Sequence, residues 1–418
     1  MSNSRLYLVL PPLMSASLLV SAIAGTGGGS LETHLHFDGP TVLVTDLVGN
    51  APIVTDRNRI VHAPHVIDPR LVNPWGIAEN EASPFWVSDS NQGIVTLYSV
   101  SGTAGTTITP LAVGIPTPGN PLSATGAPTG VVFNVDLASK GFPIFGVDSN
   151  GNTATAPAVF LFATENGTIV GWNPGINPPG FDPARAGAYG IIAVDNSANP
   201  TPAAGAVYKG LAIATDTAGN TFLYATNFRA GTVEVYDTSF NRVTPSSNPF
   251  TDPNLASQYA PFNISLQSGR FFVTYARQDA AKHDSVPGHG RGFVDTFDLE
   301  GNMLARFATR GQLNSPWGVV QAPTSFGPFA GDILIGNFGN GRINAFDSNT
   351  GEFLGKVINS KGQGILIDGL WSLLVGNGRA GGEPNTVYFT AGPNREKDGL
   401  FGSLTPVAPG TPCGTPCI

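Results

Sequence analysis

Short apolar runs separated by Gly, Pro, Asn and Asp recur along most of the chain. Runs such as Phe160-Leu161-Phe162 and Ile333-Leu334-Ile335 are continuously apolar, which is typical of strands that are buried on both faces. The residues between the runs favour tight turns. This pattern predicts many short β-strands joined by turns, and it argues against long helices.

A pattern of three such strands repeats along the chain. Each repeat begins with a strand that holds a small residue, continues with an apolar strand, and ends with a third strand that follows a glycine turn. The small residues that align the repeats are Gly76, Gly130, Gly210, Asn263, Gly318 and Gly369. Their spacings are 54, 80, 53, 55 and 51 residues, so the sequence predicts six units, one of which is enlarged by an insertion.

A unit of about fifty residues with three strands and a variable fourth is the blade of a β-propeller. One twisted sheet cannot bury both of its faces, whereas radial packing lets each blade cover the next. A glycine in the first strand suits an inner strand, where neighbouring backbones approach closely. We therefore expect an all-β, six-bladed propeller over residues 41–405.

Ring closure requires a strand from the beginning of the chain. The sixth unit stops soon after Leu404, which leaves little room for a fourth strand. Residues 41–47 alternate between apolar and polar positions like a strand, and we expect them to complete the last blade. The long interval between units two and three, with Asn173-Pro174 and Pro178-Pro179-Gly180, indicates a surface insertion.

The two ends of the chain differ from the repeats. Residues 1–24 have the layout of a secretory signal peptide, although an uncleaved anchor is an alternative. Residues 25–40 are expected to be a linker, and residues 406–418 a Pro/Gly/Cys tail in which Cys413 and Cys417 could form a local disulfide. No later segment is apolar enough for a membrane span. We expect a secreted monomer, periplasmic or extracellular.

The composition narrows the class of protein further. Only 12% of the residues are charged, while 53 are Gly and 35 are Pro, which excludes coiled coils and helical bundles. The 25 Phe residues exclude a disordered polymer. A net charge of −8 removes the electrostatic signature of a nucleic-acid-binding protein.

Polar residues are expected to gather at one mouth of the propeller, where first strands begin and second strands end. The candidate ligand-binding residues there are Asn73, Trp75, Asp89, Asn91, Glu165, Asn227, Arg277, Asp279, Trp317, Asn337 and Glu396. Their oxygens suit Ca²⁺ or another divalent cation, and a concave polar mouth is typical of a ligand site. Tight hairpins select the same residue types without any ligand.

The fourth unit carries the most polar connection in the chain, residues 275–291. In this loop Asp279, His283 and Asp284 could bind a metal, or His283 could act as a general base held by Asp284. The alternative that we favour is a loop held by two ion pairs, Arg277–Asp279 and Lys282–Asp284.

Several strings are specific enough to indicate a family. They are 71–76 (LVNPWG), 162–169 (FATENGTI), 275–284, 313–318 (LNSPWG), 336–339 (GNFG), 389–392 (FTAG) and 399–402 (GLFG). Together they resemble an uncharacterised family of exported bacterial NHL-like propellers, some members of which end in a PEP-CTERM sorting tail. The resemblance implies secretion and six blades, but no activity. This chain has no such sorting tail after Leu404.

Two functions follow from these features. The first is a secreted binding or scaffold protein whose mouth recognises a small molecule, a glycan or a protein. The second is a divalent-metal-dependent hydrolase similar to lactonases and gluconolactonases, whose cation site Glu165, Asn227 and Asn337 resemble in residue type. In that case Asp89 would also lie near the ion, and His283 would be the base. No recognisable nucleophile motif is present, which favours the first.

Overall fold

The computed structural model describes residues 41–102, 105–182, 187–246 and 249–408, which belong to one compact unit. The predicted signal peptide, the linker and both cysteines lie outside these residues. In the described part of the chain, no helix has the length and apolar character that a membrane crossing requires.

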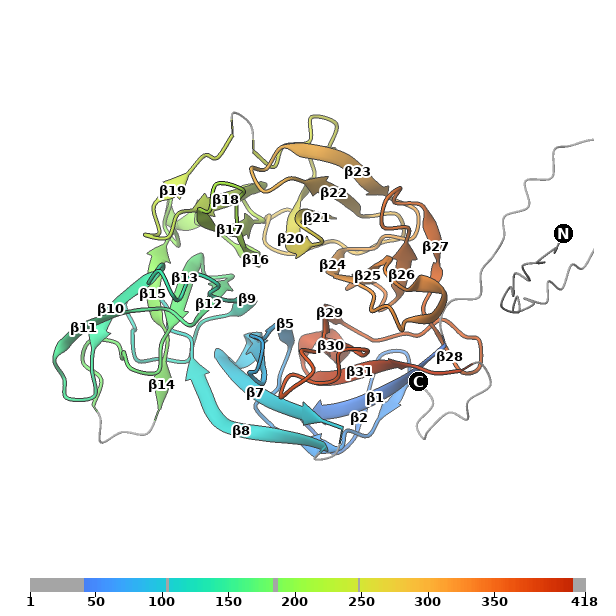
Figure 1. The fold of residues 1–418 in the computed structure, drawn as a ribbon, viewed down its shortest axis with the longest axis horizontal. Coiled ribbons are helices and arrows are strands. Elements are labelled where there is room, and N and C mark those ends of the chain that lie inside the picture. The colour runs from blue at the N-terminus through green and yellow to red at the C-terminus, as the bar shows by residue number, and fades with distance from the viewer. Residues whose placement is uncertain (1–40, 103–104, 183–186, 247–248, 409–418) are drawn as a thin grey trace, which may run out of the picture. The chain divides into compact units, whose positions relative to one another are not determined.

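Six sheets are arranged around a common axis, as the sequence predicts (Figure 1). The first blade consists of β5 (Pro74–Ala78), β6 (Phe85–Asp89), β7 (Ile94–Ser101) and β8 (Gly105–Gly114), with β14 (Ala188–Tyr189) at its outer edge. The second consists of β9 (Pro128–Phe133), β12 (Phe160–Thr164), β13 (Thr168–Trp172) and β15 (Ile191–Asp195). The third consists of β16 (Tyr208–Thr215), β17 (Thr221–Asn227), β18 (Thr232–Tyr236) and β19 (Arg242–Val243).

The remaining blades follow the same plan. The fourth consists of β20 (Tyr259–Gln267), β21 (Arg270–Arg277), β22 (Phe293–Phe297) and β23 (Met303–Thr309). The fifth consists of β24 (Pro316–Gln321), β25 (Ile333–Asn337), β26 (Ile343–Phe346) and β27 (Phe353–Lys356). The sixth consists of β29 (Leu370–Val375), β30 (Val387–Ala391), β31 (Leu400–Pro406) and β1 (Thr41–Gly49), with the short strands β28 (Ile358–Asn359) and β4 (Val66–Ile67) beside β1.

The other elements are short. Two hairpins stand outside the blades, β2 (Val54–Thr55) with β3 (Val61–His62) and β10 (Pro143–Val147) with β11 (Thr153–Pro157). The helical turns of the described residues are η1 (Ser90–Gln92), η2 (Pro202–Ala204), η3 (Gly327–Phe329) and α1 (Pro393–Glu396).

The first strand of the described chain closes the ring. β1 runs antiparallel to β31, in a register that pairs Val42 with Pro406 and Gly49 with Leu400. The prediction that residues 41–47 complete the last blade is therefore confirmed, and the strand extends two residues further. Val42, Val44 and Val48 of β1 are buried, so the closure is made by packing as well as by backbone hydrogen bonds.

The insertion lies inside the second blade and not between the second and third. The hairpin β10–β11 separates its first and second strands, and the loop that carries β14 separates its third and fourth strands. Figure 1 shows this hairpin at the outer edge of the blade. β14 then pairs with β8, so part of the insertion ties the second blade to the first.

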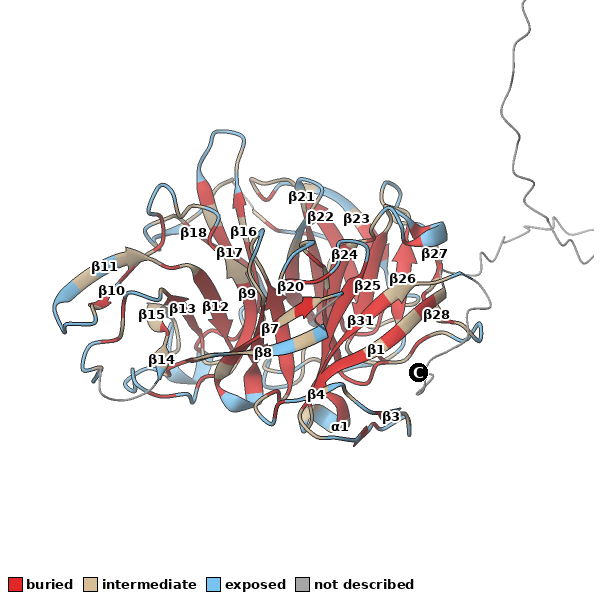
Figure 2. Ribbon diagram, turned by 60° about the horizontal axis from the view of Figure 1, so that its bottom comes forward, coloured by how far each residue is buried: buried red, intermediate tan, exposed pale blue. Residues whose placement is uncertain are grey.

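Aromatic contacts fill the space between neighbouring blades. Trp86 of the first blade stacks on Phe160 of the second with ring centroids 4.1 Å apart, and Tyr224 of the third lies 4.4 Å from Phe271 of the fourth. Figure 2 shows that the strands are largely buried, whereas exposed residues gather in the connecting loops. Burial of both faces explains the continuously apolar runs of the second strands.

The inner strands contact one another around the axis in the order β5, β9, β16, β20, β24, β29 and back to β5. Glycine is required where two of them meet: a Cβ atom on Gly76 would lie 2.4 Å from the carbonyl oxygen of Thr129 in the next blade. In the sixth blade the matching residue is Ser372 and not Gly369, because Trp371-Ser372 occupies the place of Trp75-Gly76 in the strand register. Gly369 precedes the strand and has a φ of 68°.

Candidate functional site

One end of the ring axis collects the residues that begin the inner strands and end the second strands. The register pairs Pro74 with Asp89 in the first blade and Pro316 with Asn337 in the fifth, so these two positions share one face, as expected. We call this end the polar mouth. Its ionisable side chains are Glu165, Lys209, His283, Asp284 and Glu396, which come from four blades.

The inner strands are irregular at the same place in every blade. The strand register breaks just after the first residue of β5, and equivalent breaks occur in the other five inner strands. A bulge of this kind redirects a side chain that regular alternation would place elsewhere. The residues at the break, each directly before the small inner-strand residue, are Trp75, Thr129, Lys209, Phe262, Trp317 and Trp371.

Four of these six residues are aromatic and pack together across the axis. Trp75 stacks on Trp371 with centroids 3.5 Å apart, and Trp317 meets both rings edge-on at 6.2 and 5.9 Å. Trp371 also stacks on Phe338 at 4.0 Å. We call the buried cluster the aromatic plug, and its members are Trp75, Phe228, Phe262, Trp317 and Trp371.

Lys209 lies between this plug and the polar mouth. Its side chain is 1% exposed, and its Nζ is 5.0 Å from the ring centre of Trp75. The ammonium donates to Glu165 Oε1 and lies 3.4 Å from Asp284 Oδ1. Burying an ammonium is costly unless carboxylates and hydrogen bonds replace its water, and these contacts provide that replacement.

The loop after β21 supplies a histidine–carboxylate pair. His283 Nδ1 lies 2.8 Å from Asp284 Oδ1, and the backbone N–H of His283 donates to Asp279 Oδ1 at 2.8 Å. The hydrogen bond to Asp284 raises the pKa of His283, and the same bond, together with Lys209, lowers the pKa of Asp284 to about 2. Asp284 is thus ionised at neutral pH, and its side chain is 68% exposed toward solvent.

Glu396 completes the mouth from α1. Asn73 Nδ2 donates to Glu396 Oε2 at 3.2 Å, while Asn73 Oδ1 accepts from Trp371 Nε1 at 2.9 Å. Burial raises the pKa of Glu396 to about 7, and the negative charge of Glu165 adds to that shift. A carboxyl group near its midpoint of titration at neutral pH can both donate and accept hydrogen bonds.

Several expected residues have structural partners within their own blades. Asp89 is fully buried, accepts from Thr96 Oγ1 at 2.6 Å, and has its pKa raised by burial. Asn227 Nδ2 donates to Glu234 Oε1 at 2.9 Å, and Asn337 Nδ2 donates to the carbonyl of Gln312 at 2.8 Å.

The candidate metal set Glu165, Asn227 and Asn337 stays a prediction, and the side-chain amides of Asn227 and Asn337 donate structural hydrogen bonds. The remaining expected residues lie at or under the mouth. Asn91 is exposed and donates from Nδ2 to the carbonyl of Glu396 at 2.6 Å, whereas Trp75 and Trp317 belong to the plug.

The two expected ion pairs, Arg277–Asp279 and Lys282–Asp284, do not form among the described residues, so that expectation is wrong. Asp279 holds the His283 backbone instead, and Asp284 bonds to His283 and Lys209.

A different set of residues could hold a metal ion. One ligand atom from each of Glu165, His283 and Asp284 lies within 4.8 Å of the others. Such a set of one imidazole and two carboxylates is typical of transition-metal and zinc sites rather than of Ca²⁺. However, the ammonium of Lys209 already bonds to both carboxylates, so it provides the positive charge that a cation would bring. The fit of a divalent ion between these two carboxylates is therefore poor.

Lys209 and Trp371 are site residues that the sequence patterns missed. Both stand directly before the small residue of an inner strand, like Trp75 before Gly76, so a corrected alignment of the sixth unit would have grouped them. The bulge that turns these residues toward the axis has no signal in a single sequence.

The fold and this geometry define a six-bladed β-propeller with a charged polar mouth above an aromatic plug. It is similar to two uncharacterised proteins of Acanthamoeba polyphaga mimivirus. R648 is 31% identical over 384 residues, 90% of this chain and 85% of the relative, and L690 is 31% identical over 352 residues, 83% of each. The chain belongs to the family that includes R648 and L690.

Comparisons of the chain with family models and with solved structures do not assign a function to it. No family model matches the chain. The solved structures that resemble it include a chain of a nidogen/laminin complex (TM-score 0.40, 14% identity, covering 80% of this chain and 97% of that one). A streptogramin B lyase is also similar (TM-score 0.41, 11% identity, 81% and 95%). At these scores the similarities assign neither a ligand nor an activity. The expected bacterial source and sorting-tail relatives find no support in these relatives, which are viral.

Proposed function

We propose that the protein is a secreted binding protein that holds a hydroxyl-rich small molecule, or the end of a glycan, at the polar mouth. The observation that carries this proposal is the convergence of four ionisable side chains from three blades around the buried ammonium of Lys209, which belongs to a fourth blade. Convergent polar groups next to apolar side chains, here the aromatic plug, are the usual signature of a ligand site.

The chemistry of the mouth favours hydroxyl groups. Asp284 and Glu165 accept hydrogen bonds, Lys209 donates them, and Glu396 can do either near neutral pH. A hydroxyl group also donates and accepts, so one molecule with several hydroxyls can satisfy all of these groups. The exposed side of Asp284 and of Asn91 leaves the entrance open to a ligand.

The test is a titration of mono- and disaccharides and polyols, followed by isothermal calorimetry. We expect at least one to bind wild type, and to bind Asp284→Asn and Glu396→Gln about tenfold more weakly, because a hydrogen bond to a charged group contributes about 1.5–3 kcal/mol. Glu81→Gln, at an exposed residue between β5 and β6, is the matched control. Equal affinity in all four proteins would refute the proposal.

A metal-dependent hydrolase is the second candidate, and the cluster of Glu165, His283 and Asp284 is the observation that favours it. Because Lys209 occupies both carboxylates, we expect Zn²⁺, Ca²⁺ and EDTA to leave the melting temperature of wild type unchanged. A rise of several degrees with a divalent ion, lost in His283→Ala, would instead support the hydrolase, since a ligand that binds only the folded state stabilises it.

A further inference from the structure

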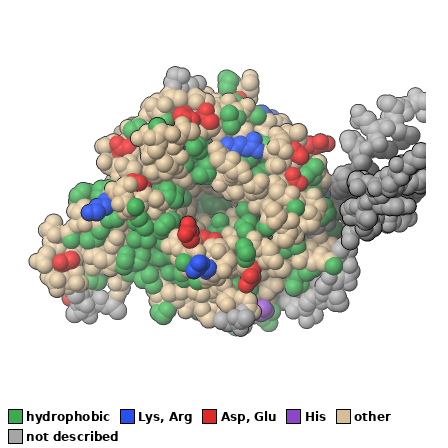
Figure 3. Space-filling view, in the orientation of Figure 1, with side chains coloured by type: hydrophobic (Ala, Val, Ile, Leu, Met, Phe, Trp, Pro, Cys, Tyr) green, Lys and Arg blue, Asp and Glu red, His purple; other side chains and the backbone are tan. Residues whose placement is uncertain are grey.

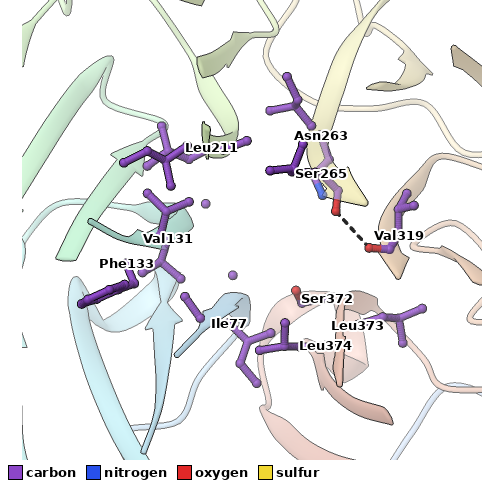
Figure 4. A pocket seen from close by; sticks show the side chains of 18 of the residues that line it. Ile77, Val131, Phe133, Leu211, Asn263, Ser265, Val319, Ser372, Leu373 and Leu374 are labelled. Atoms are coloured by element: carbon purple, nitrogen blue, oxygen red, sulfur yellow. Dashed lines mark hydrogen bonds between the residues drawn. The ribbon is translucent and has the colours of Figure 1, made fainter. Parts of the chain in front are cut away.

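A hollow opens on the face opposite to the polar mouth, where the inner strands end. It has a volume of about 350 Å³, and Figure 3 shows a hollow with hydrophobic side chains at the centre of the ring. Each blade contributes at least one aliphatic residue to its wall, and several of these residues are drawn in Figure 4. We call this hollow the apolar channel, and six equivalent residues, one from each blade, are Ile77, Val131, Leu211, Ile264, Val319 and Leu373.

The six aliphatic side chains are only 2–7% exposed, because each also packs into the core between two neighbouring blades. Asn263, Ser265 and Ser372 lie beside them around the channel (Figure 4). Trp317 of the aromatic plug lines its inner end. At the opening, Val135 and Leu266 are 56% and 38% exposed, and aliphatic side chains grouped around a cavity mark a binding site more often than scattered ones do.

Glu79 is the one ionisable residue among those that line the channel. It follows the last residue of β5, at the opening, and its Oε2 is buried without a hydrogen-bond partner in the described part of the chain. Burial raises the pKa of Glu79 to about 9, and no neighbouring cation opposes that shift. Among the described residues, this carboxyl group lacks both a hydrogen-bond partner and a counter-charge. A buried polar atom without a partner destabilises the protein.

We propose that the apolar channel binds an amphiphile with an aliphatic tail and a cationic head group, whose tail lies against the aliphatic side chains of the channel and whose head pairs with Glu79. An ammonium gives Glu79 both the hydrogen bond and the counter-charge that it lacks. The net charge of −8 also favours a cationic head over an anionic one.

Decylammonium chloride is a suitable probe, with decanol and decanoate as comparators of equal chain length. We expect calorimetry to show that decylammonium binds more tightly than either comparator. Its affinity should increase as the pH rises from 7 toward 9, because Glu79 must lose its proton to pair with the head group. Glu79→Gln should weaken the binding of decylammonium about tenfold and leave the binding of decanol unchanged.

Two further variants test the location. Val131→Phe enlarges a side chain that lines the channel and should abolish binding of both decylammonium and decanol. Val135 is exposed, so a lysine fits at this position. Val135→Lys should weaken the binding of decylammonium alone, because the two positive charges repel each other. Glu396→Gln at the polar mouth is the control and should bind the probe like wild type. Absence of decylammonium binding to folded wild type, equal binding of decanoate, or unchanged binding in both Val131→Phe and Val135→Lys overturns the proposal.

Discussion

Lys209 brings a charged amine into an aromatic environment, and three neighbours offset the loss of its hydration. Glu165 and Asp284 supply negative charge, and the face of Trp75 supplies the electrostatic attraction of a π-system. Such an arrangement is sensitive to the removal of one partner, because the remaining charge stays buried. The residue is therefore a structural support of the polar mouth as well as a donor to any ligand bound there.

The aromatic plug allows a comparison between two tryptophans of the same cluster. Trp371 Nε1 donates to Asn73 Oδ1, whereas Trp317 Nε1 is buried without a partner among the described residues. Both Trp371→Phe and Trp317→Phe lose packing, but only Trp371→Phe leaves a buried acceptor unsatisfied. We expect urea denaturation to show that Trp371→Phe is less stable than Trp317→Phe by about 1–3 kcal/mol. Equal stability of the two variants would contradict this expectation.

Glu396 should make stability depend on pH. The folded protein holds its proton up to a pKa of about 7, whereas the ordinary value is 4.5, so the folded state binds more protons between these values. The contribution of Glu396 to the free energy of unfolding therefore falls as the pH rises from about 4.5 to 7. Above pH 7 this contribution has been lost in full. Glu165, Asp284 and Lys209 are the charged groups that act on it.

Glu396→Gln removes this titration. We expect the variant to be more stable than wild type at pH 8, on the order of 1–3 kcal/mol, and to lose most of the advantage at pH 4. Chemical denaturation at a series of pH values measures the effect, with Glu81→Gln as the control. If the variant is instead less stable than wild type at pH 8, the hydrogen bond from Asn73 to the carboxylate stabilises the protein by more than burial of the charge destabilises it.

Residue identity at the site was only partly predictable. Glu165, His283, Asp284 and Glu396 could be expected at the mouth because turns after second strands expose polar residues there. Asp89, Asn227 and Asn337 meet the same rule, yet hydrogen bonds inside their own blades use their side chains. A single sequence cannot distinguish these two outcomes, because both depend on which partner lies within about 3 Å.

At the scale of the elements, the inner strands set the spacing of the blades. Gly76 and Gly130 allow adjacent inner strands to touch, since a Cβ atom at either would lie 2.4 Å from backbone atoms of the next blade. This role could be predicted from the sequence, because a glycine inside a strand pattern indicates close backbone approach. The role of Ser372 in the sixth blade could not be predicted in the same way, because Gly369 resembles the glycines of the other inner strands more closely in residue type.

Gly76→Ala tests the contact between the first and second blades. We expect it to lower stability by about 1–3 kcal/mol or more, because neither backbone can move without disturbing its blade. Gly175→Ala is a matched control, since Gly175 is exposed, has no positive φ, and would meet only Asn173 Oδ1 at 3.4 Å. Urea denaturation should show no loss for the control. A harmless Gly76→Ala would mean that the blades are farther apart than described.

β1 is the element on which ring closure depends, and its alternating pattern made it predictable. Removing residues 1–49 deletes the strand that pairs with β31 and exposes the buried face of Leu404. We expect the truncated chain to lose its cooperative thermal transition or to melt far below wild type. A chain that begins at residue 37 keeps β1 and is expected to melt like wild type. Differential scanning calorimetry distinguishes these results, and a normal transition in the shorter chain would contradict the closure.

At the scale of the whole molecule, the axis carries two different environments that the aromatic plug separates. The polar mouth lies where inner strands begin, and the apolar channel lies where they end. Repeat spacing predicted six blades and the position of the mouth, because both follow from strand order. It could not predict the channel, because that depends on how six aliphatic residues from distant parts of the sequence face one another.

The length of the second unit shows another limit of sequence patterns. A spacing of 80 residues reveals an insertion but not the strand pair between which it enters. In the structure, part of it is the hairpin β10–β11, on which Phe145 is 66% exposed, and part of it returns to the first blade as β14. Local turn signals cannot report this long-range pairing.

The six bulged residues of the inner strands occupy equivalent positions in the six blades. Trp75, Thr129, Lys209, Phe262, Trp317 and Trp371 differ in size and charge, although the six blades around them share one architecture. We therefore expect substitutions at these six positions to change which molecules the axis accepts without changing the strand order of the blades.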